Sequence, residues 1–284
     1  MSVKDLGQGR CSEQFTPPHG FTGGVEGPAC DKEGNLYAVN YEREGTIGKV
    51  TPEGVSSVFV ELPEGSIANG IRFNRAGDMF MADYTRHRIY RYSWHERRLD
   101  VLAEEPAMNQ PNDIAISSRD VLFASDPNWA DETGQLWRIN PDGKTTRLEA
   151  GMGTTNGIEV SPDDRLLYVN ESVQRRIWVY DLSEDGNVSN KRLFHEFPDY
   201  GLDGMRCDVE GYLYVTRFGK GTVAIFSPAG GLIEEVQLLG KECTNLTFGG
   251  EDGRTVYVTI KDRGNVERFV ADRPGRCRRL FGLV

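Results

Sequence analysis

The sequence has little of what nucleic-acid-binding and membrane proteins need. Its 284 residues carry a formal net charge of -10, whereas nucleic acids and anionic membranes both attract a basic surface. No run approaches the roughly 18 apolar residues of a spanning helix. Residues 1–15 also lack the apolar core of a signal peptide. We therefore expect neither a nucleic-acid partner nor a membrane partner.

Cysteine is also scarce, and its pattern argues against a disulfide framework. The five cysteines are odd in number and form no CxxC pair, which favours a reducing compartment and a cytoplasmic location. Cys30 and Cys207 are predicted to pack as small buried hydrophobes. Local clusters of basic residues are expected to be solvated turn residues. These are Arg97, Arg98, Arg276, Arg278 and Arg279.

Three common catalytic motifs are absent as well. The chain has no GxSxG elbow, no GxxxxGK[ST] loop and no GxGxxG turn, which excludes the serine-hydrolase, nucleotide-hydrolase and dinucleotide-binding classes that depend on them. The four histidines do not share a position in any pattern, so a histidine-based zinc site is not expected. His19 is retained as a candidate substrate contact because it leads into an apolar strand, with a plain loop role as the alternative.

What the sequence does contain is one unit that is repeated six times. The units begin at Glu26, Asn69, Asn112, Asn156, Asp203 and Asn245, which by subtraction are 43, 43, 44, 47 and 42 residues apart. A period near 43 residues is typical of a propeller blade.

Each unit has the same internal order of strands and turns. A short apolar strand is followed by a polar turn, such as DKEGN at residues 31–35, and by a second strand such as residues 36–39. A third strand and a weaker fourth follow, and no helical period of useful length appears. We expect an all-β fold, a six-bladed β-propeller with four antiparallel strands per blade. The prediction is a single domain over residues 1–284, in which residues 1–25 lead in and close the ring against the last blade.

The six repeat starts are predicted to face one another, because the first strand of each blade lines the central channel. They offer two carboxylates and four amides, with no imidazole or thiolate. Oxygen donors of this kind suit one hard divalent cation, Ca²⁺ before Mg²⁺, Mn²⁺, Zn²⁺ or Fe²⁺. The alternative is that the amides bond to one another and to channel waters. Asn69 and Asn245 are predicted substrate contacts within this ring.

A second set of polar residues lies at the ends of the second strands, which return to the same face. These residues are Asn40, Asp83, Asp126, Asn170, Thr216 and Thr259. Several are expected to cap turns, and Asp126 is kept as a candidate substrate contact. The loop at residues 127–132 is predicted to overhang the channel, where Trp129 either stacks on a sugar or packs between blades.

Four motifs together resemble the senescence marker protein (regucalcin), gluconolactonase and luciferin-regenerating enzyme family of six-bladed propellers. They are VEGPA at residues 25–29, QPND at 110–113, NGIEVSPD at 156–163 and GLDG at 201–204. The resemblance extends over essentially the whole chain. It departs at Gln110, a predicted substrate contact, where some sugar lactonases of the family have arginine.

The resemblance implies a metal-dependent lactonase acting on a small-molecule lactone. It implies that Glu26, Asn156 and Asp203 are metal ligands and that Asn112 is a further ligand or substrate contact. Asp203 is then the candidate general base, and Asn112 steadies the developing oxyanion. A monomer or weak homo-oligomer is expected. Two alternatives stay open: a phosphotriesterase-like hydrolase resembling diisopropyl fluorophosphatase, and a non-catalytic propeller that binds calcium or a partner.

Overall fold

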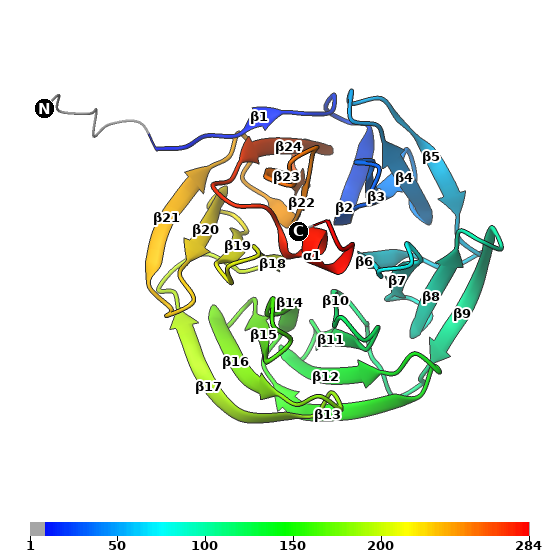
Figure 1. Cartoon of the computed structure of the whole chain (residues 1–284), viewed down its shortest axis with the longest axis vertical. Helices are drawn as coiled ribbons and strands as arrows, with labels where there is room; N and C mark the ends of the chain where they lie inside the picture. Colours follow the sequence, from blue (N-terminus) through cyan, green and yellow to red (C-terminus); the bar gives the residue numbers. More distant parts are fainter. Residues whose placement is uncertain (1–8, 284) are drawn as a thin grey trace, which may run out of the picture.

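A computed structural model describes residues 9–283 as a ring of six antiparallel four-stranded sheets around a central channel (Figure 1). This confirms the predicted six-bladed β-propeller. The first three blades are β2 (Phe21–Cys30), β3 (Leu36–Tyr41), β4 (Thr46–Val50) and β5 (Ser56–Glu61); β6 (Ala68–Phe73), β7 (Met79–Asp83), β8 (Arg88–Ser93) and β9 (Arg98–Glu104); and β10 (Ile114–Ile116), β11 (Leu122–Asn128), β12 (Thr133–Ile139) and β13 (Thr145–Met152).

The other three blades have the same order from the channel outward. They are β14 (Thr155–Val160), β15 (Leu166–Glu171), β16 (Arg176–Leu182) and β17 (Val188–Glu196); β18 (Met205–Cys207), β19 (Leu213–Arg217), β20 (Thr222–Phe226) and β21 (Leu232–Gln237); and β22 (Cys243–Gly249), β23 (Thr255–Ile260) and β24 (Asn265–Val270).

The sixth blade takes its outermost strand from the other end of the chain. β1 (Glu13–Gln14) pairs antiparallel with β24, and Glu13 lies opposite Arg268. Strands from the two ends of the described chain thus form one sheet. Such pairing ties the first blade to the sixth, because β1 leads directly into β2.

The hydrophobic core lies between neighbouring blades. One cluster, for example, joins Tyr37 and Val39 of the first blade to Ile71 and Met79 of the second. All four side chains are fully buried, because the two faces of each inner sheet pack against the sheets on either side. The inner strands therefore hold fixed positions around the channel, and polar residues on them are placed with the precision of a packed core.

Glycines allow the inner strands to approach each other at the level of the predicted ring. A Cβ atom on Gly27 would lie 1.9 Å from the Asn69 carbonyl oxygen, and one on Gly157 would lie 2.2 Å from the Asp203 carbonyl oxygen. Both distances are far inside van der Waals contact. Glycine follows four of the six ring positions and lets the ring residue of the next blade approach there. The other two positions, Asn112 and Asn245, are followed by Asp113 and Leu246.

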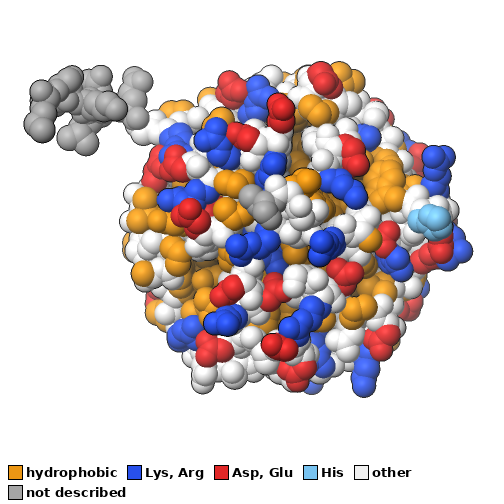
Figure 2. Space-filling model, viewed as in Figure 1, with side chains coloured by type: hydrophobic (Ala, Val, Ile, Leu, Met, Phe, Trp, Pro, Cys, Tyr) orange, Lys and Arg blue, Asp and Glu red, His pale blue; other side chains and the backbone are white. Residues whose placement is uncertain are grey.

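The opposite mouth of the channel is closed by the only helix among residues 9–283, α1 (Arg276–Leu280), which lies at the centre of the ring in Figure 1. Basic and acidic side chains are interspersed on this face (Figure 2). Arg276 is buried, and its guanidinium group lies 2.7 Å from the Asp164 carboxylate and 3.5 Å from that of Glu159. The prediction that Arg276 is a solvated turn residue was therefore wrong, because the buried Glu159 and the partly buried Asp164 of the fourth blade compensate its charge.

Two further sequence predictions concern cysteines and membranes. Cys30 and Cys207 are buried, as predicted, and all five cysteines are free thiols. Within residues 9–283 no helix has the length and apolar character needed to cross a membrane.

The close approach at Gly157 leads to a stability prediction. Gly157→Ala should lower the free energy of unfolding by about 1–3 kcal/mol, because the new methyl group overlaps the Asp203 carbonyl and must push two blades apart. Urea denaturation measures the change. Gly231→Ala is the matched control, since its methyl group would meet only the Ser227 hydroxyl at 3.4 Å. Equal stability of the two variants would contradict the argument.

Candidate functional site

A cavity of about 560 Å³ opens at the mouth opposite α1 and holds most of the predicted site. Its volume is in the range of small-molecule sites. Seven predicted residues line it: Glu26, Asn69, Gln110, Asn112, Trp129, Asn156 and Asp203. They come from five blades, so only closure of the ring brings them together.

The inner strands fix these side chains through their backbones. Glu26, Asn69 and Asn156 lie within β2, β6 and β14. Asn112 and Asp203 lie just before β10 and β18, where the peptide N–H of Asn112 donates to Ser125 O at 2.8 Å and that of Asp203 donates to Thr216 O at 3.1 Å. Asn112 and Asp203 are therefore held by sheet-like hydrogen bonds and Glu26 by its pairing with Val39. Asn69 and Asn156 lie at register shifts of β6 and β14.

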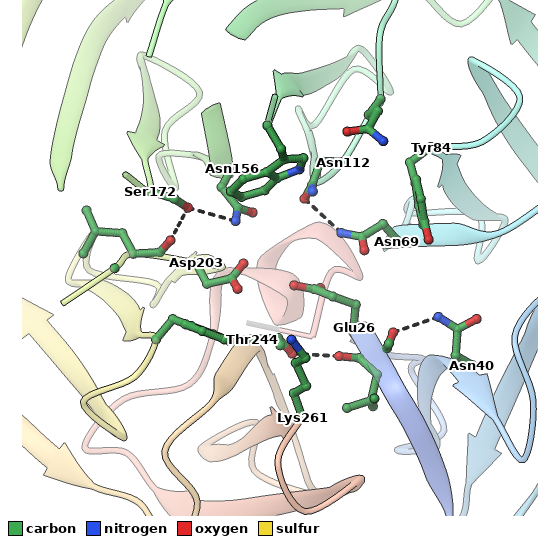
Figure 3. A pocket seen from close by; sticks show the side chains of 18 of the residues that line it. Glu26, Asn40, Asn69, Tyr84, Asn112, Asn156, Ser172, Asp203, Thr244 and Lys261 are labelled. Carbon is green, nitrogen blue, oxygen red and sulfur yellow. Dashed lines mark hydrogen bonds between the residues drawn. The ribbon is translucent and has the colours of Figure 1, made fainter. Parts of the chain in front are cut away.

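Two carboxylates, Glu26 and Asp203, face each other across the base of the cavity (Figure 3). Burial and the negative charge of Asp113 raise the pKa of Glu26 to about 7. Burial and the charge of Glu26 raise the pKa of Asp203 well above its ordinary value. Glu26 is oriented by hydrogen bonds from the Asn245 side chain, at 2.9 Å, and from the Gly27 peptide. The pair carries negative charge that is costly without a cation nearby.

Two amides complete the donor set, and each is oriented by a neighbour. The Asn156 Nδ2 group donates to the Ser172 hydroxyl at 3.0 Å, while Asn156 Oδ1 is buried and has no hydrogen-bond partner among residues 9–283. The Asn112 Oδ1 atom accepts from Asn69 Nδ2 at 2.9 Å, which leaves the Asn112 Nδ2 group for the cavity. The alternative that ring amides bond to one another thus describes one pair, Asn69 and Asn112.

These donors fit a hard divalent cation. Two carboxylates and an unsatisfied amide oxygen are ligands that Ca²⁺ prefers, and a cation would offset both the raised pKa values and the unpaired Asn156 Oδ1 atom. No three His, Cys, Asp or Glu side chains form a metal-binding group in the described chain. Glu26, Asp203 and Asn156 would therefore hold the ion as a mixed carboxylate and amide set rather than as a zinc-type cluster, whereas the predicted ligand Asn112 turns its Nδ2 group to the cavity.

A third carboxylate, Asp113, sits beside the pair but is not free for a metal. Its two oxygens lie 3.2 Å from Arg72 and 3.2 Å from Arg206. Burial opposes its ionisation, but the two guanidinium groups outweigh burial and hold the pKa of Asp113 below its ordinary value. Asp113 is therefore a structural ion pair.

Three predicted substrate contacts are not among the cavity-lining residues. Asp126 is fully buried and accepts hydrogen bonds from the peptide N–H groups of Asn109 and Gln110 and from the Trp137 indole. Asn245 lies behind Glu26 and orients it. His19 is an exposed loop residue with a φ of 62°. The structure thus gives Asp126 and Asn245 supporting roles and leaves His19 outside the cavity wall.

Sequence reasoning missed several wall residues that follow the second strands. Ser172, Phe218 and Lys261 line the cavity, and each lies two positions after a polar strand end, at Asn170, Thr216 and Thr259. The shared phase is a signal that the repeat contained. Tyr84 and Thr244 were also missed, and Asn40, which belongs to the predicted second set of polar residues, lines the cavity as well (Figure 3). Trp129 is 44% exposed, which fits a ligand-facing position better than packing between blades.

Comparison with known proteins places these motifs in a wider group. The family model "SMP-30/Gluconolactonase/LRE-like region" matches residues 24–261. A gluconolactonase of Zymomonas mobilis is 29% identical and is aligned over 82% of this chain and 75% of its own length. Diisopropyl-fluorophosphatase of Loligo vulgaris is 25% identical over 92% of this chain and 94% of its own. The calcium-binding protein regucalcin of Agrobacterium tumefaciens has a similar fold, with a TM-score of 0.80, 20% identity and coverage of 95% and 97%.

The donor set predicts that a divalent cation stabilises the fold. Saturating Ca²⁺ at pH 8 should raise the melting temperature of the wild type by about 5 °C, because an ion that binds only the folded state adds its binding free energy to stability. Glu26→Gln and Asp203→Asn should lose this shift. In EDTA, Glu26→Gln should be at least as stable as the wild type, because the substitution relieves buried charge.

The control for this melting experiment is Glu64→Gln, which removes an exposed carboxylate away from the cavity and should keep the full shift. Scanning fluorimetry with Ca²⁺, Mg²⁺, Mn²⁺, Zn²⁺ and Fe²⁺ ranks the ions. An unchanged wild-type melting temperature with every ion would rule out the metal site.

Proposed function

The chain belongs to the SMP-30/gluconolactonase/LRE-like family, and we propose that it is a metal-dependent hydrolase that opens a small lactone, with Ca²⁺ as the preferred ion. The observation that supports this most is the convergence of Glu26, Asp203, Asn112 and Asn156 on one cavity. Gluconolactonase is the name of a relative aligned over most of the chain. A sugar aldonolactone or a related cyclic ester is the proposed substrate.

The proposed mechanism divides the work among these side chains. A divalent cation, when bound, supplies electrophilic polarisation of the ester carbonyl. Glu26, Asn156 and Asp203 hold that ion, and Asn112 donates from its Nδ2 group to the oxygen on which negative charge develops. Asn69 keeps the Asn112 amide in the orientation that permits this donation.

Asp203 is proposed as the general base. A water oxygen attacks the ester carbonyl carbon, and the water proton passes to Asp203. The ring C–O bond then breaks, and the leaving alkoxide takes up a proton, which gives the hydroxy acid. Burial and Glu26 raise the basicity of Asp203, while a bound cation lowers it again. Asp203 is essential whether it takes up the water proton or, with its basicity lowered by the ion, only orients the water.

A second enzymatic candidate is phosphotriester hydrolysis. It is favoured by the similarity to the squid diisopropyl-fluorophosphatase, which extends over nearly the full length of both chains. The same ion and donors would then bind a phosphoryl oxygen instead of a carbonyl oxygen. Parallel assays on aldonolactones and organophosphates separate the two reactions, and inactivity on both favours the non-catalytic alternative.

Substitution of Asp203 tests the catalytic assignment. Asp203→Asn should lower kcat for lactone hydrolysis at least about 100-fold, because an amide cannot take up the water proton. A pH-indicator assay follows acid release, and circular dichroism checks that the fold is retained. Asp142→Asn removes an exposed carboxylate of the turn between β12 and β13 and should keep full activity. Activity of Asp203→Asn above about a tenth of the wild-type value would remove the assigned role.

Removal of the metal tests the cofactor directly. Treatment with EDTA followed by desalting should abolish lactone hydrolysis, and adding back Ca²⁺ should restore most of it, because the cavity supplies no other electrophile at its base. Elemental analysis of gently purified protein identifies the bound ion. Full activity after complete chelation would contradict metal dependence.

A further inference from the structure

One basic side chain reaches the cavity. Among the described residues that line it, Lys261 alone is a lysine, arginine or histidine. Lys261 directly follows β23, at the same mouth as the ring donors, and Figure 3 shows its side chain directed into the cavity on the side of Glu26 and Thr244. This position is part of the rim rather than of the metal centre.

The backbone of Lys261 is fixed while its ammonium group stays accessible. Its peptide N–H donates to Glu242 O at 2.8 Å, and its carbonyl accepts from the Gly264 N–H at 3.2 Å. The Nζ atom lies 5.6 Å from the centre of the Phe218 ring, another wall residue. Only the Glu242 carboxylate pairs with it among residues 9–283, at 3.8 Å, and the Lys261 side chain is 45% exposed. An exposed pair at that distance contributes little and is readily exchanged.

The charges around the cavity leave Lys261 as the group that favours an anion. A divalent ion would balance Glu26 and Asp203, and Asp113 is already neutralised by arginines below them. The rest of the wall holds amides, hydroxyls, the aromatic rings of Tyr84, Trp129 and Phe218, and the aliphatic side chains of Val25, Val173 and Leu202. A neutral polyol needs only the amides and hydroxyls. A substrate with a second charged group has Lys261 as its partner.

We propose that Lys261 selects lactones that carry an additional anionic group, a carboxylate on the carbon chain away from the ester, over neutral sugar lactones. The proposal rests on the lactonase function proposed above and names the substrate class for the same site. The Lys261 ammonium group binds the carboxylate at the rim while the ester lies at the ion, so Lys261 acts on substrate binding and leaves the chemical step to the ring.

The test uses two lactones that differ only at one carbon. Glucono-1,4-lactone ends in a neutral hydroxymethyl group, and glucaro-1,4-lactone ends in a carboxylate. The wild-type protein with Ca²⁺ should have a kcat/KM for the glucaro-lactone at least about 10-fold higher. Lys261→Met should lower that value by about 10- to 100-fold, mainly through KM, since one charged hydrogen bond is lost. Its kcat/KM for the glucono-lactone should stay within about threefold of the wild-type value.

Three control variants separate recognition from a structural role. Lys261→Arg keeps the charge and should keep the preference, and Lys241→Ala removes an exposed lysine outside the cavity wall and should change nothing. Glu242→Gln removes the competing carboxylate and should lower KM for the glucaro-lactone. A merely structural ion pair would instead make Lys261→Met and Glu242→Gln equally harmful to both substrates.

The outcomes distinguish this proposal from the one it rests on. Hydrolysis of both lactones without a preference for the carboxylate, or equal losses on both in Lys261→Met, overturns the role of Lys261 and leaves the lactonase intact. Inactivity of the wild type on both lactones, in the presence of Ca²⁺, overturns the lactonase function itself and the Lys261 proposal with it.

Discussion

The buried repulsion between Glu26 and Asp203 is the interaction on which the site depends. Two ionised carboxylates repel each other, and the pKa of each is raised above its ordinary value. The fold imposes the contact, because interblade packing holds β2 and the segment before β18 in place and glycines such as Gly157 let the inner strands close up. The core therefore provides the free energy that holds the two acidic side chains together, and either a proton or a cation relieves the repulsion between them.

The neighbouring carboxylate shows the other way in which the channel handles buried charge. Asp113 follows a ring residue directly, yet it lies between Arg72 and Arg206 and its pKa is lowered. Two arginines thus form ion pairs with Asp113. No lysine or arginine of residues 9–283 forms one with Glu26 or Asp203, although Arg206 lies near enough to oppose the rise in the pKa of Glu26. Because arginines occur within the same channel, the lack of such an ion pair at Glu26 and Asp203 among residues 9–283 supports the proposed cation site over a structural charge network.

The period of the sequence predicted the fold and the ring, because a residue's phase in the repeat decides which face of the blade it occupies. The phase does not decide whether a side-chain oxygen is already engaged in hydrogen bonds within the protein. Asp126 has the right phase, but the backbone turns back so that two peptide N–H groups and an indole use its carboxylate. The prediction that Arg276 is solvated was wrong because nothing in its local sequence indicates the acidic residues of the fourth blade that pair with it. Both outcomes depend on contacts between distant segments, which a single sequence does not contain.

Closure of the far mouth explains why selectivity should lie in the rim. The cavity next to α1 measures only about 40 Å³, and Arg276 and Phe281 are part of its wall. A substrate therefore enters and leaves through the opposite mouth and passes the residues that follow the second strands. Of those residues, Phe218 and Lys261 sit on turns outside the packed sheets, where a substitution costs little stability. Ser172 is buried and orients Asn156, so it belongs with the ring. Under the proposed function, the ring must keep its donors to hold an ion, whereas rim positions such as Lys261 are free to change, so we propose that the chemistry and the choice of substrate reside in different layers of one channel.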